Sequence, residues 1–238
     1  TIPDFLRDSV AKPRGFEAVE PTDVVLPRVQ LMQSIDERVQ GGEFKAGDLV
    51  NSLTGAKIPS PTKLVIVDHF KSRIFWGPRE EGNNLLCSSP DGRTPVHTRY
   101  ATACATCPNA QFTELPDGRR ENPRCTVYFN FPALVNGERL GLSLSRTKIR
   151  VAKRLVSMAR FLGYDIWAGL YELGTRLEKG KKGPYHNFTV TQRGFVDRVT
   201  FEVAKQFHEA IRNTRVSIHA EQEEKDEEIV TKDDEVAF

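Results

Sequence analysis

Four cysteines are the residues whose type and spacing most clearly indicate chemistry. Cys87, Cys104, Cys107 and Cys125 are the only cysteines in the chain, and they follow the pattern C-x16-C-x2-C-x17-C. Disulfides are rare inside cells, whereas four thiolates suit the tetrahedral coordination and soft-ligand preference of zinc. Because four protein ligands leave no coordination position open to water, such a site would be structural. The spacing therefore predicts a structural Zn²⁺ held by a module over residues 87–125.

Three other interpretations of the cysteines stay open. Four thiolates can also hold an iron–sulfur cluster, and thiols that bind no metal can be inert or redox-active. His97 lies inside the same window and could replace one thiolate as a ligand. Pro-Asp-Gly-Arg turns at 90–93 and 116–119 stand on either side of the Cys104–Cys107 pair. These turns favour a compact module under every interpretation.

Charge forms a second pattern. The chain has a net charge of +2, but residues 221–238 hold nine acids and two bases, which leaves residues 1–220 at +9. Residues 139–160 contain seven bases and no acid. A basic body favours a polyanionic partner, and a helix with charges of one sign favours phosphate contacts. The alternative is a solubilising tail on a mildly basic domain whose cations face only solvent.

Aromatic residues are interleaved with bases over residues 63–76 and just beyond. In proteins that bind single strands, bases stack on aromatic rings while cations follow the phosphates. Because adjacent residues of a strand face opposite sides, only one of Phe75 and Trp76 is expected to stack on bases. The expected nucleic-acid-binding residues are Lys71, Arg73, Phe75, Trp76, Arg79, Arg146, Lys148, Arg150, Lys153, Arg154, Lys181, Lys182 and Tyr185.

The elements that would position these residues are mainly strands. Hydrophobic patterning predicts helices over 146–162 and 199–212. It predicts strands over 28–33, 48–54, 63–76, 126–131, 140–144, 166–177 and 185–191, with turns at 136–137 and 178–184. This pattern indicates a fold that is α+β or mainly β, namely an OB-like small barrel with the zinc module inserted and flanking helices.

The expected organisation has three parts. Residues 1–25 form an N-terminal arm, residues 26–215 form the OB-like nucleic-acid-binding domain, and residues 216–238 form a disordered acidic tail. The sequence lacks the P-loop, dinucleotide, HExxH and G-x-S-x-G motifs, so we expect no enzyme activity. It also lacks a long apolar run and an N-terminal signal pattern, so we expect no membrane partner.

The acidic C-terminal residues resemble those of a known class. Asp233, Asp234, Glu235 and the final Phe238 resemble the tails of bacterial and T7-type phage single-stranded DNA-binding proteins, with Val-Ala at 236–237 in place of the usual Ile-Pro. The resemblance implies that these four residues recruit replication or recombination proteins. The terminal ring would enter a pocket while the carboxylates meet Lys or Arg.

Residues 24–215 resemble a set of phage proteins of the same size. The shared segments are 26–33, 47–55, 71–82, 104–108 and 142–147. The resemblance implies a phage protein acting in the cytoplasm of the infected bacterial host. We expect it to bind and protect single-stranded DNA, without sequence specificity, during phage replication or recombination, and it could form a homo-oligomer. Two alternatives are a zinc-containing regulator that binds a host protein such as RNA polymerase, and a recombination-associated nuclease.

Overall fold

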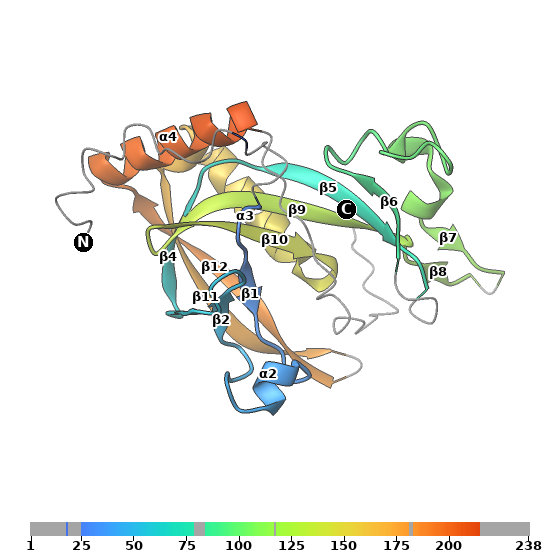
Figure 1. Ribbon diagram of the computed structural model, residues 1–238, viewed down its shortest axis with the longest axis horizontal. Coiled ribbons are helices and arrows are strands. Elements are labelled where there is room, and N and C mark those ends of the chain that lie inside the picture. The colour runs from blue at the N-terminus through green and yellow to red at the C-terminus, as the bar shows by residue number, and fades with distance from the viewer. Residues whose placement is uncertain (1–17, 19–24, 79–83, 117, 181–182, 215–238) are drawn as a thin grey trace.

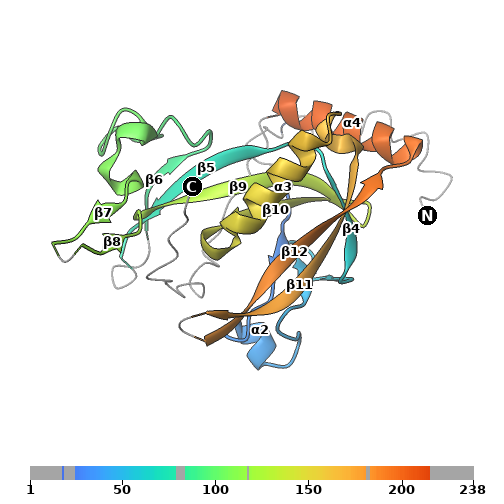
Figure 2. The ribbon, with the colours of Figure 1, turned by 180° about the vertical axis from the view of Figure 1, so that it is seen from behind.

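The computed structural model describes residues 18, 25–78, 84–116, 118–180 and 183–214. Within them the protein is mostly β, with few helices (Figures 1 and 2). The strands and α-helices are, in order, β1 Val29–Leu31, α2 Glu37–Gln40, β2 Leu49–Asn51, β3 Lys57–Ile58, β4 Thr62–Ile66, β5 Phe70–Trp76, β6 Leu85–Ser89, β7 Thr113–Glu114, β8 Arg120–Glu121, β9 Cys125–Val135, β10 Glu138–Ser145, α3 Ile149–Phe161, β11 Gly169–Gly180, β12 Gly183–Phe195 and α4 Arg198–Thr214. Short 3-10 turns cover Cys104–Thr106, Pro108–Ala110, Arg146–Lys148 and Ile166–Ala168.

A seven-stranded antiparallel sheet forms the body of the molecule. Its strand order is β12-β11-β4-β9-β5-β6, and β10 pairs with β9. The β9–β10 turn has positive φ at both Asn136 (51°) and Gly137 (87°), which is the geometry that two-residue hairpins prefer. The turn predicted at these residues is therefore confirmed.

The main sheet is open rather than closed into a barrel. In the described residues, β12 and β6 end the path and do not pair with each other. A barrel needs every strand edge to be paired around a closed circuit. The expected small barrel is thus not what these strands form, and only the coarser prediction of a mostly β protein is confirmed.

A β-bulge interrupts the long strand that the sequence predicts over residues 63–76. The predicted strand over 63–76 is two strands, β4 and β5, which both pair with β9. Between them, the Val67 and Asp68 N–H groups both donate to the Pro132 carbonyl, at 2.8 and 3.4 Å. Two residues opposite one make a β-bulge, which bends the strand. Pro132 has no N–H to donate, so a bulge is where a central strand tolerates it.

The bulge separates two ends of the sheet. β11 pairs with β4 on one side of it, and β6 pairs with β5 on the other. The loops between β6 and β9 consequently lie at one end of the molecule, and the β11–β12 hairpin lies apart from them, below the centre of the view (Figure 1). The sheet thereby holds the cysteine segment well away from that hairpin.

Each face of the main sheet carries a helix. Ala152, Leu155 and Ala159 of α3 pack into a core that includes Leu64 and Ile66, together with the three-stranded β1-β2-β3 sheet. The opposite face packs against α4 through Ala204, Phe207 and Ile211, which meet Val65 and Val67. The alternation of residues 64–67 between the two cores follows from the twofold repeat of a strand. None of the helices among the described residues has the length and apolar character needed to cross a membrane.

Candidate functional site

Strand pairing places two of the four cysteines. Cys87 of β6 and Cys125 of β9 both pair with Phe75 of β5, so the three side chains share one face of the sheet. Cys104 and Cys107 bracket a 3-10 turn in which the Cys107 N–H donates to the Cys104 carbonyl at 3.3 Å. The register of the sheet and this turn bring together residues far apart in the sequence.

All four cysteines line one small pocket. Its volume is about 20 Å³, and Arg73, Phe75, His97 and Tyr100 also line it. A cavity of this size holds about one sphere as large as a water molecule. All four thiols are free, and Cys104 is buried while the other three are partly buried. The structure thus gathers the four predicted ligands, with His97, around a space large enough for a single ion.

Burial controls the electrostatics of this pocket. It raises the pKa of Cys125 to about 11, and the neighbouring Arg73 cation opposes that rise only in part. The thiols of Cys87, Cys104 and Cys107 add to the rise, because several negative charges in one pocket repel each other. Cys125 is therefore protonated at neutral pH in the chain alone. A bound cation would be needed to hold four thiolates there.

The side chains do not adopt a metal-binding arrangement. Among the described residues, no group of three or more His, Cys, Asp and Glu side chains is disposed to hold a metal ion. Phe75 stands between Cys87 and Cys125, so two strand spacings, about 10 Å, separate their backbones. His97 is exposed, and its carbonyl accepts a weak hydrogen bond from the Cys87 thiol at 3.7 Å. Zinc, an iron–sulfur cluster and metal-free thiols all stay predictions.

The basic residues of α3 form its outer face. Arg150, Lys153 and Arg154 are exposed, opposite the buried Ala152 and Leu155. In the part of the chain that the structure describes, no carboxylate forms an ion pair with Arg150 or Arg154. The charges of these two guanidinium groups would have to be neutralised by groups outside the described residues, and phosphates could do so.

Other predicted cations lie on the same side of the sheet as α3. Lys71 pairs in register with Phe129, whose ring belongs to the core under α3, and the Lys71 ammonium lies 4.7 Å from that ring centroid. Arg73, two residues on, shares this face and lines the cysteine pocket. The Lys148 ammonium lies 5.6 Å from the Phe188 ring. Arg146, also exposed, begins the 3-10 turn that leads into α3.

The two aromatic candidates on β5 have different environments. Phe75 is only 9 % exposed and meets the Tyr100 ring edge-on at 5.4 Å. Trp76 is half-buried, and a shift in register separates it from Phe75. Trp76 is therefore the more accessible of the pair. Arg79, Lys181, Lys182, Asp233, Asp234, Glu235 and Phe238 lie outside the described residues.

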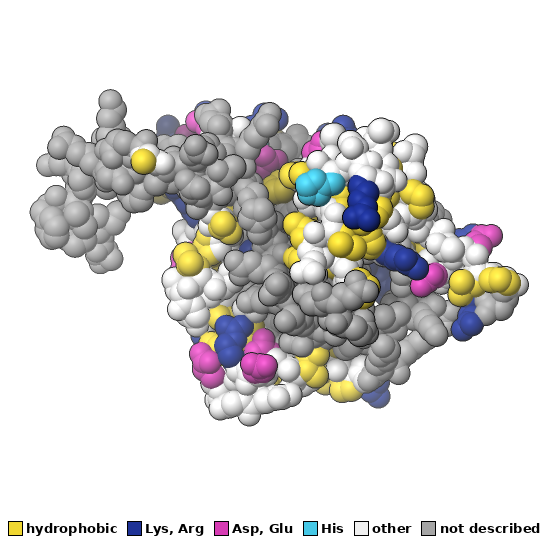
Figure 3. Space-filling model, turned by 45° about the vertical axis from the view of Figure 1, so that its right-hand side comes forward, with side chains coloured by type: hydrophobic (Ala, Val, Ile, Leu, Met, Phe, Trp, Pro, Cys, Tyr) yellow, Lys and Arg dark blue, Asp and Glu magenta, His cyan; other side chains and the backbone are white. Residues whose placement is uncertain are grey.

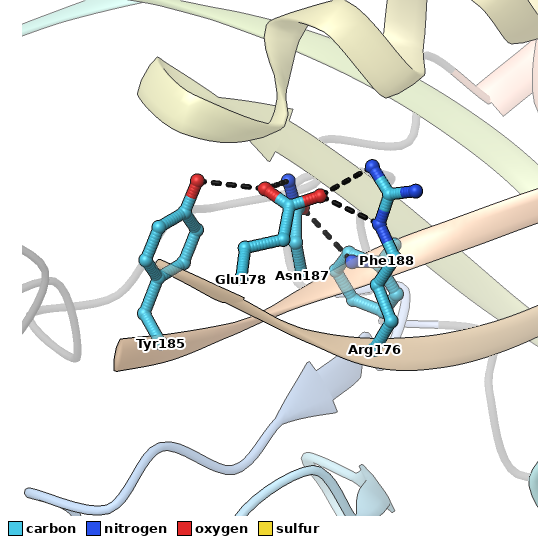
Figure 4. A network of polar contacts seen from close by, with 5 residues as sticks. All are labelled: Arg176, Glu178, Tyr185, Asn187 and Phe188. Carbon is cyan, nitrogen blue, oxygen red and sulfur yellow. Dashed lines mark hydrogen bonds and ion pairs between the residues drawn. The ribbon is translucent and has the colours of Figure 1, made fainter. Parts of the chain in front are cut away.

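Tyr185 belongs to a network on the β11–β12 hairpin. Its hydroxyl donates to Glu178 at 2.7 Å, and Asn187 donates to the same carboxylate at 3.0 Å. Arg176 donates to the other carboxylate oxygen, so the side chains converge on Glu178 (Figure 4). Burial raises the pKa of Glu178, but the hydrogen bonds from Asn187, Tyr185 and Arg176 outweigh it and lower the pKa overall. The Tyr185 hydroxyl is thus fixed within the hairpin.

This network should contribute stability that acid removes. Because the folded chain holds the pKa of Glu178 below its usual 4.5, the contribution is present above that pH and is lost as pH falls further. We expect Glu178→Gln to lower the melting temperature at about pH 6 and to have little effect near pH 3. Melting curves across this range test it. Glu172→Gln is the control, because it also removes one carboxylate–arginine pair, to Arg193 at 2.8 Å, from the same strand. An equal pH dependence in both variants would contradict the prediction.

Exposed aromatic residues outside the predicted set lie near the end of α3 and on the cysteine module, where Phe112 is 61 % exposed. Phe161, Tyr164 and Phe195 are 87 %, 69 % and 57 % exposed. A sequence signal existed for Phe161, because it follows Arg150 and Arg154 at helical spacings of eleven and seven residues and so falls on the same side of α3. No local pattern identifies Phe195, whose exposure depends on where β12 ends against α3.

The comparisons with known proteins identify a class of phage proteins. Residues 1–217 match the model of the Pam3 phage gp34-like protein family, so the chain belongs to this family. The phage origin expected from the sequence is thereby confirmed. The comparison with curated proteins found no match, and the comparison with solved structures found none either.

Proposed function

We propose that this phage protein binds and protects single-stranded DNA, without sequence specificity, during replication or recombination in the cytoplasm of the infected host. The observation that carries the proposal is the outer face of α3, where Arg150 and Arg154 are exposed and no described carboxylate pairs with them. Lys71 and Arg73 lie on the same side of the sheet. Cations on one side of a curved sheet suit a phosphate backbone that runs across it.

We propose a structural role for the cysteine module in this activity. The gathering of four thiols around a space for one ion supports a bound Zn²⁺, which would hold the β6–β9 loops against the main sheet. Zinc binding would require movement of the β6 or β9 backbone as well as rotation of the cysteine side chains, since Phe75 stands between Cys87 and Cys125 and the present arrangement is not a metal-binding one. We also propose that the curved antiparallel sheet is related to the sheet of an OB-fold.

We propose that the acidic residues 221–238 recruit partner proteins. This segment carries a net charge of −7 and ends in Asp233, Asp234, Glu235 and Phe238. Those residues suit a basic pocket with an apolar floor. The same charge would compete with DNA for the basic face of α3.

Fluorescence anisotropy tests the proposed function. We expect the full chain to bind a labelled oligo-dT of about 30 nucleotides, with an affinity that falls steeply as salt rises and that duplex competitor does not abolish. A chain that ends at residue 220 should bind more tightly, because the competing negative charge is gone. Absence of binding at low salt would refute the proposal. Loss of the oligonucleotide in the presence of Mg²⁺ would instead indicate the nuclease alternative.

One observation favours the regulator alternative. Hydrophobic side chains reach the surface on the side of the molecule that Figure 3 brings forward. In the cysteine module, Val96 is 57 % and Phe112 is 61 % exposed. Exposed apolar side chains of this kind often contact proteins. A regulator that binds a host protein such as RNA polymerase through this module would show no preference for single strands over duplex. It would also keep its partner without residues 221–238.

A further inference from the structure

A group of exposed aromatic rings lies where α3 ends. Tyr164 and Phe195 meet edge-to-face, with ring centroids 5.4 Å apart and an interplanar angle of 88°. Phe161, three residues before Tyr164, is 87 % exposed, so nearly all of its ring is in water. Covering such rings by a partner removes apolar surface from water, which is favourable. A cluster of exposed rings therefore indicates a binding surface.

Two arginines of α3 lie on the same side of the helix as the Phe161 ring. Arg150, Arg154, Ser157 and Phe161 are spaced i, i+4, i+7 and i+11, so they lie on one side of α3. The helical rise places the first and last about 16 Å apart along the axis. One helix face therefore presents two guanidinium groups, a hydroxyl and an exposed ring in sequence.

The surface beside Phe161 is hollowed. An open hollow of about 400 Å³ is lined by Phe161, Arg154, Ser157, Met158, Leu162 and Gln192. A single water molecule needs only about 10–15 Å³ of such space. Gln192 belongs to β12, which contacts α3 and runs beside it (Figure 2). Phe195 follows three residues later, so the end of α3 and the end of β12 form one surface.

We propose that Phe161, Tyr164 and Phe195 form a base-stacking platform for single-stranded nucleic acid, whose phosphates run along Arg150 and Arg154. This proposal rests on the proposed function and deepens it by naming where bases are held. Aromatic faces stack on any base, which suits binding without sequence specificity. The continuity of the rings with these two arginines favours nucleic acid over a protein partner, because a polyanion with planar bases matches both features.

Two oligonucleotides of equal length and charge test the platform. One is oligo-dT, and the other is an abasic strand with the same phosphates but no bases. We expect the full chain to bind oligo-dT more tightly. The variant Phe161→Ala/Tyr164→Ala should lose about 5- to 150-fold in affinity for oligo-dT per stacked base, while its affinity for the abasic strand and its salt dependence stay unchanged. Phe161→Trp should keep the preference, since indole also stacks.

Phe112→Ala is the matched control. It removes another exposed ring, 61 % exposed, from the cysteine module and should leave the preference for oligo-dT intact. An unchanged preference in the Phe161/Tyr164 variant would overturn the platform, leave the proposed function standing, and assign the rings to a protein contact. An equal loss on both strands would also overturn it, because stacking cannot weaken binding to a strand without bases. Failure of the unmodified chain to bind either strand would overturn the platform and the proposed function together.

Discussion

Replacing Arg150, Lys153 and Arg154 with alanine should weaken binding to single-stranded DNA by about a hundredfold at about 0.1 M salt. Each phosphate contact on a single strand contributes about 0.7 to the slope of log affinity against log salt. Three lost contacts therefore flatten the slope by about 2. All three side chains are exposed on α3, opposite the residues that pack on the sheet, so the variant should keep its fold.

A second helix provides the control for this experiment. Arg198, Lys205 and Arg212 are exposed on α4, which packs on the opposite face of the sheet. Their replacement with alanine changes the net charge by the same amount. Anisotropy titrations at several salt concentrations give the affinity and the salt slope of each variant, and we expect a large loss only in the α3 variant. Equal losses in both would mean that only overall charge matters, and α3 would then not be the binding face.

Replacing Cys104 and Cys107 with serine should remove the metal and loosen the cysteine module. We expect elemental analysis to find about one zinc ion for each unmodified chain and far less in the variant. Structural zinc contributes apparent binding free energies of about 10–16 kcal/mol in small zinc-binding units, so its loss should have a large local effect. Limited proteolysis should then cut between β6 and β9 in the variant before it cuts the unmodified chain.

Thr102→Ala is the control for the cysteine experiment. Thr102 is exposed in the same loop, so its loss should change neither metal content nor protease resistance. Iron in place of zinc, with visible absorbance, would indicate an iron–sulfur cluster instead. A folded chain that holds no metal and has four readily alkylated thiols would contradict the metal prediction altogether.

Features that depend on neighbouring residues were predictable from the sequence. The Asn136-Gly137 turn adopts the two positive φ angles for which this dipeptide is suited. Gly163, predicted to stop the helix that begins near residue 146, has φ +77° and follows Leu162, the C-cap of α3. The helix predicted over 199–212 lies within α4. In each case the conformation is decided by the backbone preferences and contacts of residues that lie within a few positions of one another in the chain.

Features that depend on distant residues were not predictable. The strand predicted over 63–76 is interrupted because the Pro132 carbonyl, on another strand, accepts from two successive N–H groups. The same pairing with β9 bends the strand at this bulge. The preference between Phe75 and Trp76 also needed the fold, since alternation along a strand does not say which face the core covers.

By itself the sequence determined the number and spacing of the cysteines, the run of bases over 139–160, the separation of charge between body and tail, and the family to which the chain belongs. Only the tertiary structure decided that the cysteines share one pocket, that Phe75 is covered, and that Phe161 stands in water beside Arg154. The physical reason is that composition and spacing reside in the covalent chain. Burial and proximity instead follow from strand register and helix packing, which join residues distant in sequence.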